Sequence, residues 1–309
     1  MDKLLSIVVP CFNEESVLPA FWTELCSVLK TIQQYRFEFI FVDDGSTDNT
    51  LTVLKKLSAE DKRVRYISFS RNFGKESAIF AGLKKSVGNL VVLMDADLQD
   101  PPALLPVMIQ KLTHSDIDIV ATKRKNRKGE AVMRSFFANT FYRLINRISW
   151  TKIESGSRDF RMMKRCVVNA ILEVSEYNRF TKGIFPWVGF KTDWIAYENV
   201  PRKDGKTKWS FWGLFLYSIN GITAFSTVPL AFASFLGLLF CFLSFCGIIF
   251  VIFQKLLFGG AAYGWSSLVC LLFFVSGIQL FCIGILGQYL SKTYMETKKR
   301  PLFIVREEL

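Results

Sequence analysis

Two long stretches without a charged residue limit what this chain can fold into. No Asp, Glu, Lys or Arg occurs from Ser210 to Gln254, and none occurs from Leu256 to Ser291. A membrane-spanning helix needs roughly 20 consecutive apolar residues, so each stretch is long enough to hold one. The core helix of a soluble protein would be shorter and would carry a polar face. The 30 Phe residues also favour a chain embedded in lipid.

The uncharged region divides into segments of different character. Residues 210–227 are rich in aromatic side chains, which predicts an amphipathic helix lying in the membrane interface. Residues 228–291 predict a hairpin of two transmembrane helices, at about 228–253 and about 266–290. Residues 292–309 then form a tail, and residues 1–209 form a separate domain.

Charge predicts how the hairpin is oriented. The loop between the two spans carries a single cation, Lys255, whereas the tail carries Lys292, Lys298, Lys299 and Arg300. The positive-inside rule therefore places both termini and residues 1–209 in the cytoplasm. The apolar run in "MDKLLSIVVPCFNEE" is too short for a signal peptide. We expect a multi-pass protein of the cell inner (plasma) membrane.

The net charge of +12 is compatible with nucleic acid as a partner. In a membrane-bound chain, anionic lipid headgroups and phosphorylated substrates explain the charge better, so we expect no nucleic acid. The basic run "TKRKNRK" at 122–128 is as well explained by a solvated loop as by a site, judged alone. A single histidine and scattered cysteines leave little for zinc chemistry.

Residues 1 to about 125 alternate apolar runs with helical patterns. Strands are predicted at 5–9, 37–42, 64–69, 90–94 and 117–121, and helices at 15–33, 49–60, 75–86 and 102–113. This alternation is typical of an α/β fold with a mainly parallel sheet. In such sheets ligands bind at the carboxyl ends of the strands. Here those ends carry "PCFNEE", "DDGSTDNT", "SRNFGKESA" and "DADLQDPP".

The last of these clusters predicts a metal site. Asp95 and Asp97 lie two residues apart in an extended strand end and so point to the same side. Two carboxylates, with Gln99 as a neutral oxygen donor, suit Mg²⁺ or Mn²⁺. The alternative is an acidic turn that enters a helix with Asp100 as its cap, which leaves Asp95 and Asp97 unexplained. Neither G-x-G-x-x-G nor a complete phosphate-binding loop is present.

Five motifs in order give the chain a strong resemblance to a known family. "IVVPCFNEE", "VDDGSTDNT", "RNFGKESAIFAGL", "DADLQDPP" and "DFRMMKR" resemble the family 2 glycosyltransferases of GT-A fold, in particular the polyprenyl-phosphate hexosyltransferases. The resemblance covers nearly the whole chain, including the spans and the tail. Processive polysaccharide synthases share the early motifs, but they carry Q-x-x-R-W and more spans, which this chain lacks.

The resemblance implies a role for particular residues. The implied nucleotide-sugar site comprises Pro10, Phe12, Asn13, Glu14, Asp43, Asp44, Lys75, Asp95 and Ala96, and Arg202 and Lys208 in "RKDGKTKWS" are expected to close over the donor diphosphate. Asp95, Asp97 and Gln99 are implied to hold the metal, and Asp159 to lie near the reacting centre, with Asp97 the second catalytic residue. Acceptor phosphate is expected at Arg124, Arg127, Arg134 and Ser135.

The expected reaction is the inverting, metal-dependent transfer of a hexose from a UDP-hexose to undecaprenyl (polyprenyl) phosphate at the cytoplasmic leaflet. UDP-glucose is the first expectation for the donor and UDP-GlcNAc the second. A dolichol-type mannosyltransferase and a catalytically silent scaffold that only binds nucleotide sugar stay open as alternatives. The run "LFIV" at 302–305 needs a sheet edge, either its own or that of a neighbour. Related enzymes are implied to exchange such tails, so we expect a homo-oligomer, a tetramer.

Overall fold

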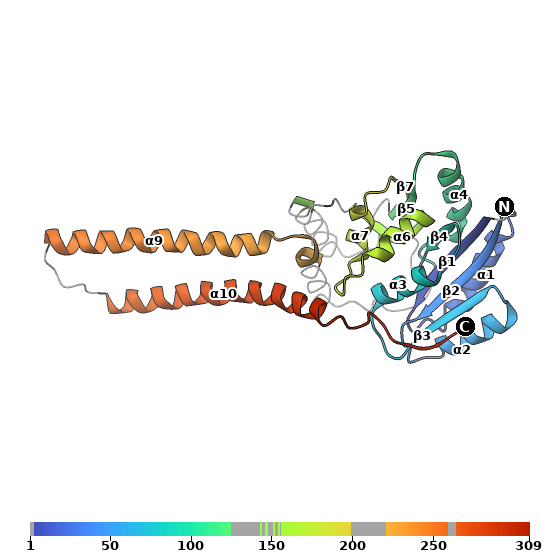
Figure 1. Cartoon of the computed structure of the whole chain (residues 1–309), viewed down its shortest axis with the longest axis horizontal. Coiled ribbons are helices and arrows are strands. Elements are labelled where there is room, and N and C mark those ends of the chain that lie inside the picture. Colours follow the sequence, from blue (N-terminus) through green and yellow to red (C-terminus); the bar gives the residue numbers. More distant parts are fainter. Residues whose placement is uncertain are drawn as a thin grey trace. The chain divides into compact units, whose positions relative to one another are not determined.

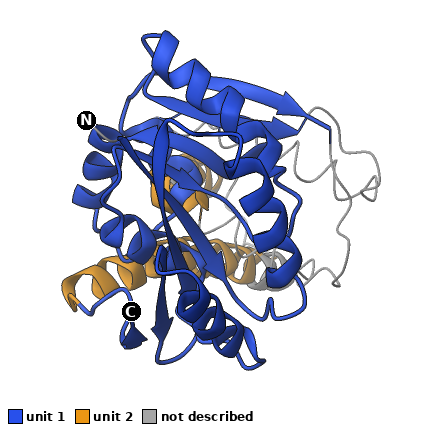
Figure 2. Cartoon of the chain, turned by 90° about the vertical axis from the view of Figure 1, so that its right-hand side faces the viewer, with its two compact units in different colours: residues 1–218, 300–309 blue, residues 219–299 orange. Residues whose placement is uncertain are grey.

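The computed structural model describes residues 3–124, 143, 146–147, 151, 154, 156–198, 221–258 and 264–309. The chain divides into two compact units, one of Met1–Ser218 with Arg300–Leu309 and one of Ile219–Lys299 (Figure 2).

A mixed, mainly parallel sheet forms the centre of the first unit. Its strand order among the described residues is β7-β5-β6-β4-β1-β2-β3-β8. The strands are β1 (Lys3–Cys11), β2 (Tyr35–Asp43), β3 (Val64–Phe69), β4 (Leu90–Leu93), β5 (Ile119–Arg124), β6 (Ser157–Lys164), β7 (Thr192–Tyr197) and β8 (Val305–Glu308). Strands β1 to β4 run parallel to one another, whereas β6 runs antiparallel to both of its neighbours, β4 and β5. The α/β fold expected from the sequence is confirmed.

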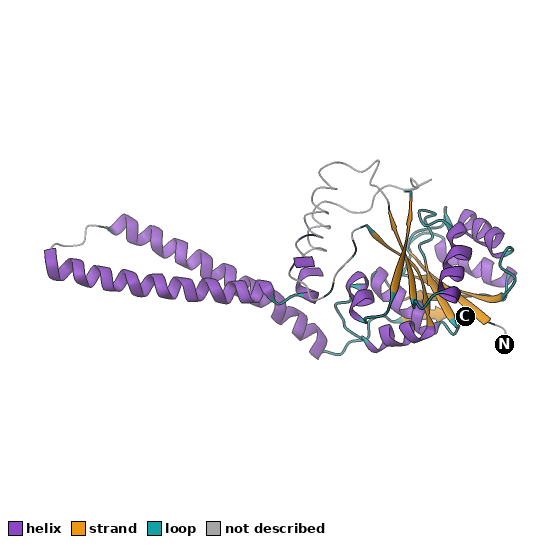
Figure 3. Ribbon diagram, turned by 90° about the horizontal axis from the view of Figure 1, so that it is seen from above, coloured by secondary structure: helices purple, strands orange, loops and turns teal. Residues whose placement is uncertain are grey.

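Helices lie on both sides of this sheet (Figures 1 and 3). They are α1 (Leu18–Leu29), α2 (Thr50–Glu60), α3 (Lys75–Lys85), a 3-10 turn at Pro102–Leu104, α4 (Leu105–His114), α6 (Arg165–Glu173) and α7 (Thr181–Trp187). Alternate residues of β1 face opposite sides: Ile7 and Val9 join the core formed with α1, while Val8 faces Gly82 of α3. Burial on both faces explains why most of the strand is apolar.

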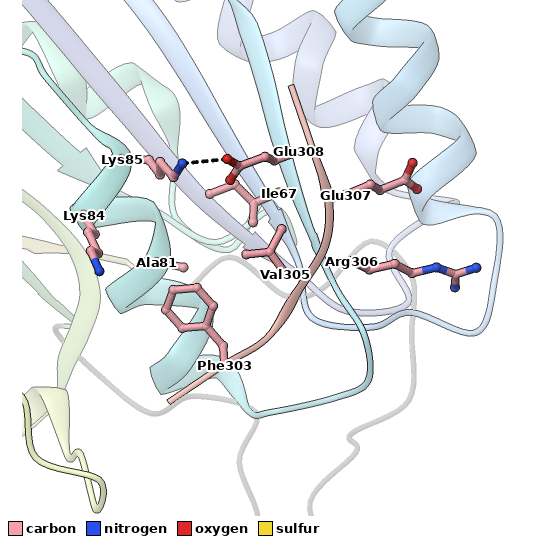
Figure 4. A pocket seen from close by; sticks show the side chains of 9 residues that line it. All are labelled: Ile67, Ala81, Lys84, Lys85, Phe303, Val305, Arg306, Glu307 and Glu308. Carbon is pink, nitrogen blue, oxygen red and sulfur yellow. Dashed lines mark hydrogen bonds and ion pairs between the residues drawn. The ribbon is translucent and has the colours of Figure 1, made fainter. Parts of the chain in front are cut away.

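The end of the chain closes one edge of the sheet. Strand β8 pairs antiparallel with β3, and the ring of Phe303 stacks on that of Phe69 with centroids 4.8 Å apart. Lys85 and Glu308 form an ion pair of 2.8 Å beside a pocket of about 440 Å³ (Figure 4). The strand begins at Val305, the last residue of the "LFIV" run, and Phe303 of the same run supplies the stacked ring.

The second unit contains two long helices, α9 (Val228–Phe258) and α10 (Trp265–Thr297). Within the described part of the chain, segments Val228–Gln254 and Leu271–Thr297 are long and apolar enough to cross a membrane. The rings of Phe240 and Phe274 pack edge to face, 5.9 Å apart, and the hydroxyl of Tyr289 donates to the carbonyl of Ser226 at 2.6 Å. The ring contact joins the two helices as a hairpin (Figure 1), and the hydrogen bond joins α10 to the residues just before α9.

Candidate functional site

Polar side chains from five strands meet at one edge of the sheet, which we call the carboxyl edge. Strands β1, β2, β4 and β5 end there, and β6 begins there because it runs antiparallel to β4 and β5. Residues that are far apart in the sequence, such as Asp95 after β4 and Asp159 in β6, are therefore brought together. Parallel strands place their carboxyl ends, and so their ligands, on the same side.

Lys75 lies between two of the acids at this edge. Its ammonium is 2.7 Å from a carboxylate oxygen of Asp95 and 2.6 Å from one of Asp159. Burial opposes the charged ammonium, but the carboxylates of Asp159 and Asp95 outweigh it and raise the pKa of Lys75. Burial likewise opposes the carboxylate of Asp159, yet the charge of Lys75 holds its pKa well below the ordinary value. Lys75 and Asp159 therefore stay ionised.

Backbone geometry explains why Lys75 is placed there. It is the first residue of α3, and Gly74 before it has a φ of +95°, a left-handed conformation that few side chains tolerate. The following residue, Glu76, accepts hydrogen bonds from the backbone N–H and the hydroxyl of Thr181, at the start of α7. Burial and the charge of Asp159 raise the pKa of Glu76 to about 7. The turn at Gly74 and the hydrogen bonds between Glu76 and Thr181 thus fix the position of the first turn of α3.

The expected metal ligands lie directly after β4. A carboxylate oxygen of Asp97 accepts the backbone N–H of Gln99 at 3.1 Å, across Leu98, whose φ is +56°. No group of three or more His, Cys, Asp and Glu residues that could hold a metal occurs among the described residues. Two carboxylates nevertheless fit Mg²⁺ or Mn²⁺, because these ions take further oxygens from water and substrate phosphates. The short contact of the Lys75 ammonium with Asp95 shows that this carboxylate already holds a cation.

Gln99 has other partners in this structure. Its side-chain oxygen accepts hydrogen bonds from the guanidinium groups of Arg124, at 2.9 Å, and Arg158, at 3.2 Å. Arg124 is the last residue of β5 and Arg158 the second residue of β6. The structure therefore brings the predicted acceptor residue Arg124 next to the predicted metal ligand Gln99.

Polar side chains tie together the carboxyl ends of β1, β2 and β3 and the loops that follow them. The side-chain oxygen of Asn13 accepts the backbone N–H of Thr47 at 2.8 Å, and the hydroxyl of Ser68 donates to Asp43 at 2.7 Å. Asp44 accepts the backbone N–H groups of Phe73 and Gly74, at 2.7 and 3.0 Å. Burial raises the pKa of Asp44 to about 6. These bonds give the predicted nucleoside side of the site a defined shape.

The other predicted residues divide into two groups. Pro10 and Ala96 are buried at the carboxyl edge, and Phe12 and Glu14 lie partly exposed in the loop after β1. Arg127, Arg134, Ser135, Arg202 and Lys208 lie outside the described residues.

Sequence reasoning missed four residues at or next to the carboxyl edge. Asp100, expected only as a helix cap, is fully buried, and one of its oxygens accepts from Arg158 at 3.0 Å and from the hydroxyl of Tyr197 at 2.7 Å. Glu76 stood beside Lys75 in "GKES" without an assigned role. Arg158 is adjacent to Asp159 in "SRDFR", which was a usable signal, whereas nothing in "TDWIAYEN" distinguished Tyr197.

Comparison with known proteins gives consistent relatives. The family model described as "Glycosyl transferase family 2" matches residues 6–172. The chain is 41% identical over 307 residues to the putative glycosyltransferase CsbB of Bacillus subtilis (strain 168), covering 98% of this chain and 92% of that relative. It is 40% identical over 302 residues to the prophage bactoprenol glucosyl transferase homolog of Escherichia coli (strain K12), covering 98% of both.

Among solved structures, glucosyl-3-phosphoglycerate synthase from Mycobacterium tuberculosis, in complex with Mn²⁺, UDP-glucose and phosphoglyceric acid, is similar to part of the chain. The sequence identity is 18% and the TM-score 0.47, over 72% of this chain and 78% of that one.

Proposed function

This chain belongs to glycosyl transferase family 2, and from that premise we propose that it transfers a hexose from a nucleotide diphosphate sugar to a polyprenyl phosphate. The observation that carries the proposal is the 40% identity, over 98% of both chains, to a protein named as a bactoprenol glucosyl transferase homolog. Similarity over this length includes the two apolar helices, which a soluble acceptor would not require.

The carboxyl edge supports this chemistry. A phosphate monoester has a second pKa of about 6, so an acceptor oxygen is already ionised at about pH 7 and needs no strong general base. In the proposed step that oxygen attacks the anomeric carbon on the face opposite the diphosphate. The bond from that carbon to the diphosphate oxygen breaks, the nucleoside diphosphate leaves with the electron pair, and the configuration is inverted.

The protein must bring two anionic substrates together, which costs Coulomb energy unless cations lie between them. In the proposal Arg124 contacts the acceptor phosphate, while Lys75 and Asp159 lie at the reacting centre. Asp95 and Asp97 would hold Mg²⁺ or Mn²⁺, which when bound neutralises charge on the leaving diphosphate. Asn13, Asp43 and Asp44 would shape the nucleoside side.

The finer assignments belong to the same proposal. Undecaprenyl phosphate is the proposed acceptor and UDP-glucose the proposed donor, ahead of UDP-GlcNAc, because the relatives are named glucosyl transferases. We place residues 1–209 in the cytoplasm, 210–227 in the interface and 228–291 across the inner membrane, with 292–309 as a cytoplasmic tail. The proposed assembly is a homotetramer.

Lipid-linked sugar formation by the purified full-length protein tests the proposal. The protein in detergent is incubated with undecaprenyl phosphate and each of several nucleotide sugars, with Mn²⁺ or with EDTA. We expect a glucolipid from UDP-glucose that EDTA abolishes. Product from UDP-GlcNAc alone would show that the transferred sugar is GlcNAc and not glucose. If no donor gives a product, the scaffold that only binds nucleotide sugar is favoured.

A further inference from the structure

Arg158 is a cation of the carboxyl edge that has no role in the hexose transfer proposed for this site. It lies in β6, one residue before Asp159, and 20% of its side chain is exposed to solvent. Its Nε donates to Asp100 at 3.0 Å and one of its terminal nitrogens donates to Gln99 at 3.2 Å. The guanidinium therefore has a buried side, on Asp100, and a side that reaches the edge.

Asp100 and Tyr197 hold this guanidinium from within the protein. The carboxylate of Asp100 is fully buried, and the oxygen that accepts from Arg158 also accepts from the hydroxyl of Tyr197 at 2.7 Å. Its other oxygen is buried and has no hydrogen-bond partner within the part of the chain that the structure describes. A buried carboxylate is costly unless a cation pairs with it, and Arg158 is that cation.

Two guanidinium groups converge on one neutral oxygen. Arg124 reaches the side-chain oxygen of Gln99 at 2.9 Å, and Arg158 reaches the same atom. Arg124 and Tyr197 are register partners on β5 and β7, so adjacent strands supply the two arginines and the tyrosine. Asp100 pairs with Arg158 on its buried side, whereas the atom at which the two guanidinium groups meet is the neutral amide oxygen of Gln99. An anion with several oxygens can contact both guanidinium groups at once, and the planar fork of a guanidinium matches phosphate.

We propose that Arg158 binds a substrate phosphate together with Arg124, and that Asp100 and Tyr197 are positioning residues that hold Arg158 in place. Gln99 keeps the two guanidinium groups aimed at a common point. This inference rests on the proposed function, in which Arg124 contacts the phosphate of the lipid acceptor. The diphosphate of the donor is the other possible source of the phosphate, and the test separates the two. The alternative is that Arg158 serves only as the counter-ion of Asp100.

The two sources of phosphate are separated by measuring KM for each substrate. We expect Arg158→Gln to raise one KM about tenfold or more, since a hydrogen bond to a charged group is lost, and Arg158→Lys to restore part of the loss. A rise for undecaprenyl phosphate assigns Arg158 to the acceptor, and a rise for the nucleotide sugar assigns it to the donor. If both KM values stay within about twofold of the wild type, the inference is overturned.

Two further variants separate phosphate binding from structural support. Tyr197→Phe removes only a hydroxyl, and we expect it to raise the same KM by a smaller factor with little change in melting temperature. Arg165 is the matched control, because it donates to the backbone carbonyl of Gly88 at 2.7 and 2.8 Å, just after the opposite end of β6. Arg165→Gln should lower the melting temperature and leave both KM values unchanged. If Arg158→Gln and Tyr197→Phe also lower the melting temperature and leave both KM values unchanged, as expected for Arg165→Gln, then Arg158 is only the counter-ion of Asp100.

Binding measurements keep this test independent of turnover. Calorimetry gives the Kd of UDP and of undecaprenyl phosphate for the wild type and Arg158→Gln. If the wild type binds these ligands but makes no lipid-linked sugar, the proposed function is contradicted. A larger Kd for Arg158→Gln than for the wild type would still support the assignment of Arg158 to phosphate binding. Equal Kd values in the two proteins refute that assignment whether or not the wild type turns over.

Discussion

At the scale of single residues, Lys75 makes it possible for several acids to share one sheet edge. Asp95 and Asp159 lie within 2.7 Å of its ammonium, and without that charge two neighbouring carboxylates would repel each other. A substrate complex that places a divalent ion on Asp95 would release Lys75 from that partner.

Asp97→Asn tests the proposed metal site. The substitution keeps the shape of the side chain and its hydrogen bond with Gln99 but removes a negative charge. We expect turnover to fall by at least about a hundredfold, because charge stabilisation of the leaving group is lost, while the protein stays folded. Product formation is measured over a range of Mn²⁺ concentrations. Asp116→Asn, at an exposed position paired with Lys191, is the control that should keep full activity. If Asp97→Asn turns over as fast as the wild type at saturating Mn²⁺, Asp97 is not an essential metal ligand.

Glu76→Gln tests a link between burial and pH. The folded protein raises the pKa of Glu76 to about 7, above the ordinary value, so between these two values the folded state binds more protons than the unfolded state. The stability that this group contributes is therefore full in acid and is lost as the pH rises through about 7. Glutamine does not titrate and can still accept from Thr181. We expect the melting temperature of Glu76→Gln, relative to that of the wild type, to be higher at about pH 8 than at about pH 5. An equal difference at both pH values would show that Glu76 titrates normally.

At the scale of elements, the contact between α3 and the sheet positions the site. Gly82 of α3 faces β1 and β2, and a Cβ added there would lie 2.3 Å from a methyl carbon of Val8 and 3.2 Å from one of Val42. Gly82 thus allows the helix to approach the sheet closely, and this approach fixes where Lys75, in the first turn of the same helix, can reach.

Gly82→Ala sets helix propensity against packing. Alanine favours a helix over glycine by about 1 kcal/mol, but overpacking a buried contact costs about 1–3 kcal/mol. We expect the packing cost to exceed the gain, so the melting temperature should fall and kcat should fall with it as Lys75 shifts. Gly237→Ala in α9 is the matched control, because among the described residues no atom beyond the neighbouring backbone of its own helix lies within 4 Å of its added Cβ. A more stable Gly82→Ala protein with full activity would show that α3 adjusts without moving the site.

The spacing of apolar residues predicted the elements of the first 125 residues, because each of these elements has a recognisable local pattern. Strands β1 to β5 and helices α1 to α4 correspond to the apolar and helical runs of residues 1–125. Strand β6 was missed because "SRDFRMMK" mixes charged and apolar residues, and its position between β4 and β5 depends on partners far away in the sequence. The acids of the site were found through their motifs. The contacts of Asp100 with Arg158 and Tyr197 span 58 and 97 residues and have no local pattern.

At the scale of the whole molecule, the chain passes twice between its two units. It leaves the first unit after Ser218 and returns at Arg300, so the docked tail is a second covalent connection to the helical hairpin. The tail is held by the pairing of β8 with β3, by the ion pair of Lys55 with Glu307 at 2.8 Å, and by the stacking of Phe303 on Phe69. All of these contacts are made by a segment of fewer than ten residues.

A strand of this kind can pair with the same edge of another copy, because the contacts require only a β3 edge and the side of α3. We therefore expect deletion of residues 301–309 to lower the oligomeric mass of the protein in detergent and to leave membrane insertion intact. Light scattering after size-exclusion chromatography gives the mass. Phe303→Ala keeps the strand but loses the stacked ring, so it should reduce assembly less than the deletion does. A truncated protein with the oligomeric mass of the full chain would show that the tail only covers the β3 edge of its own subunit and does not carry the interface.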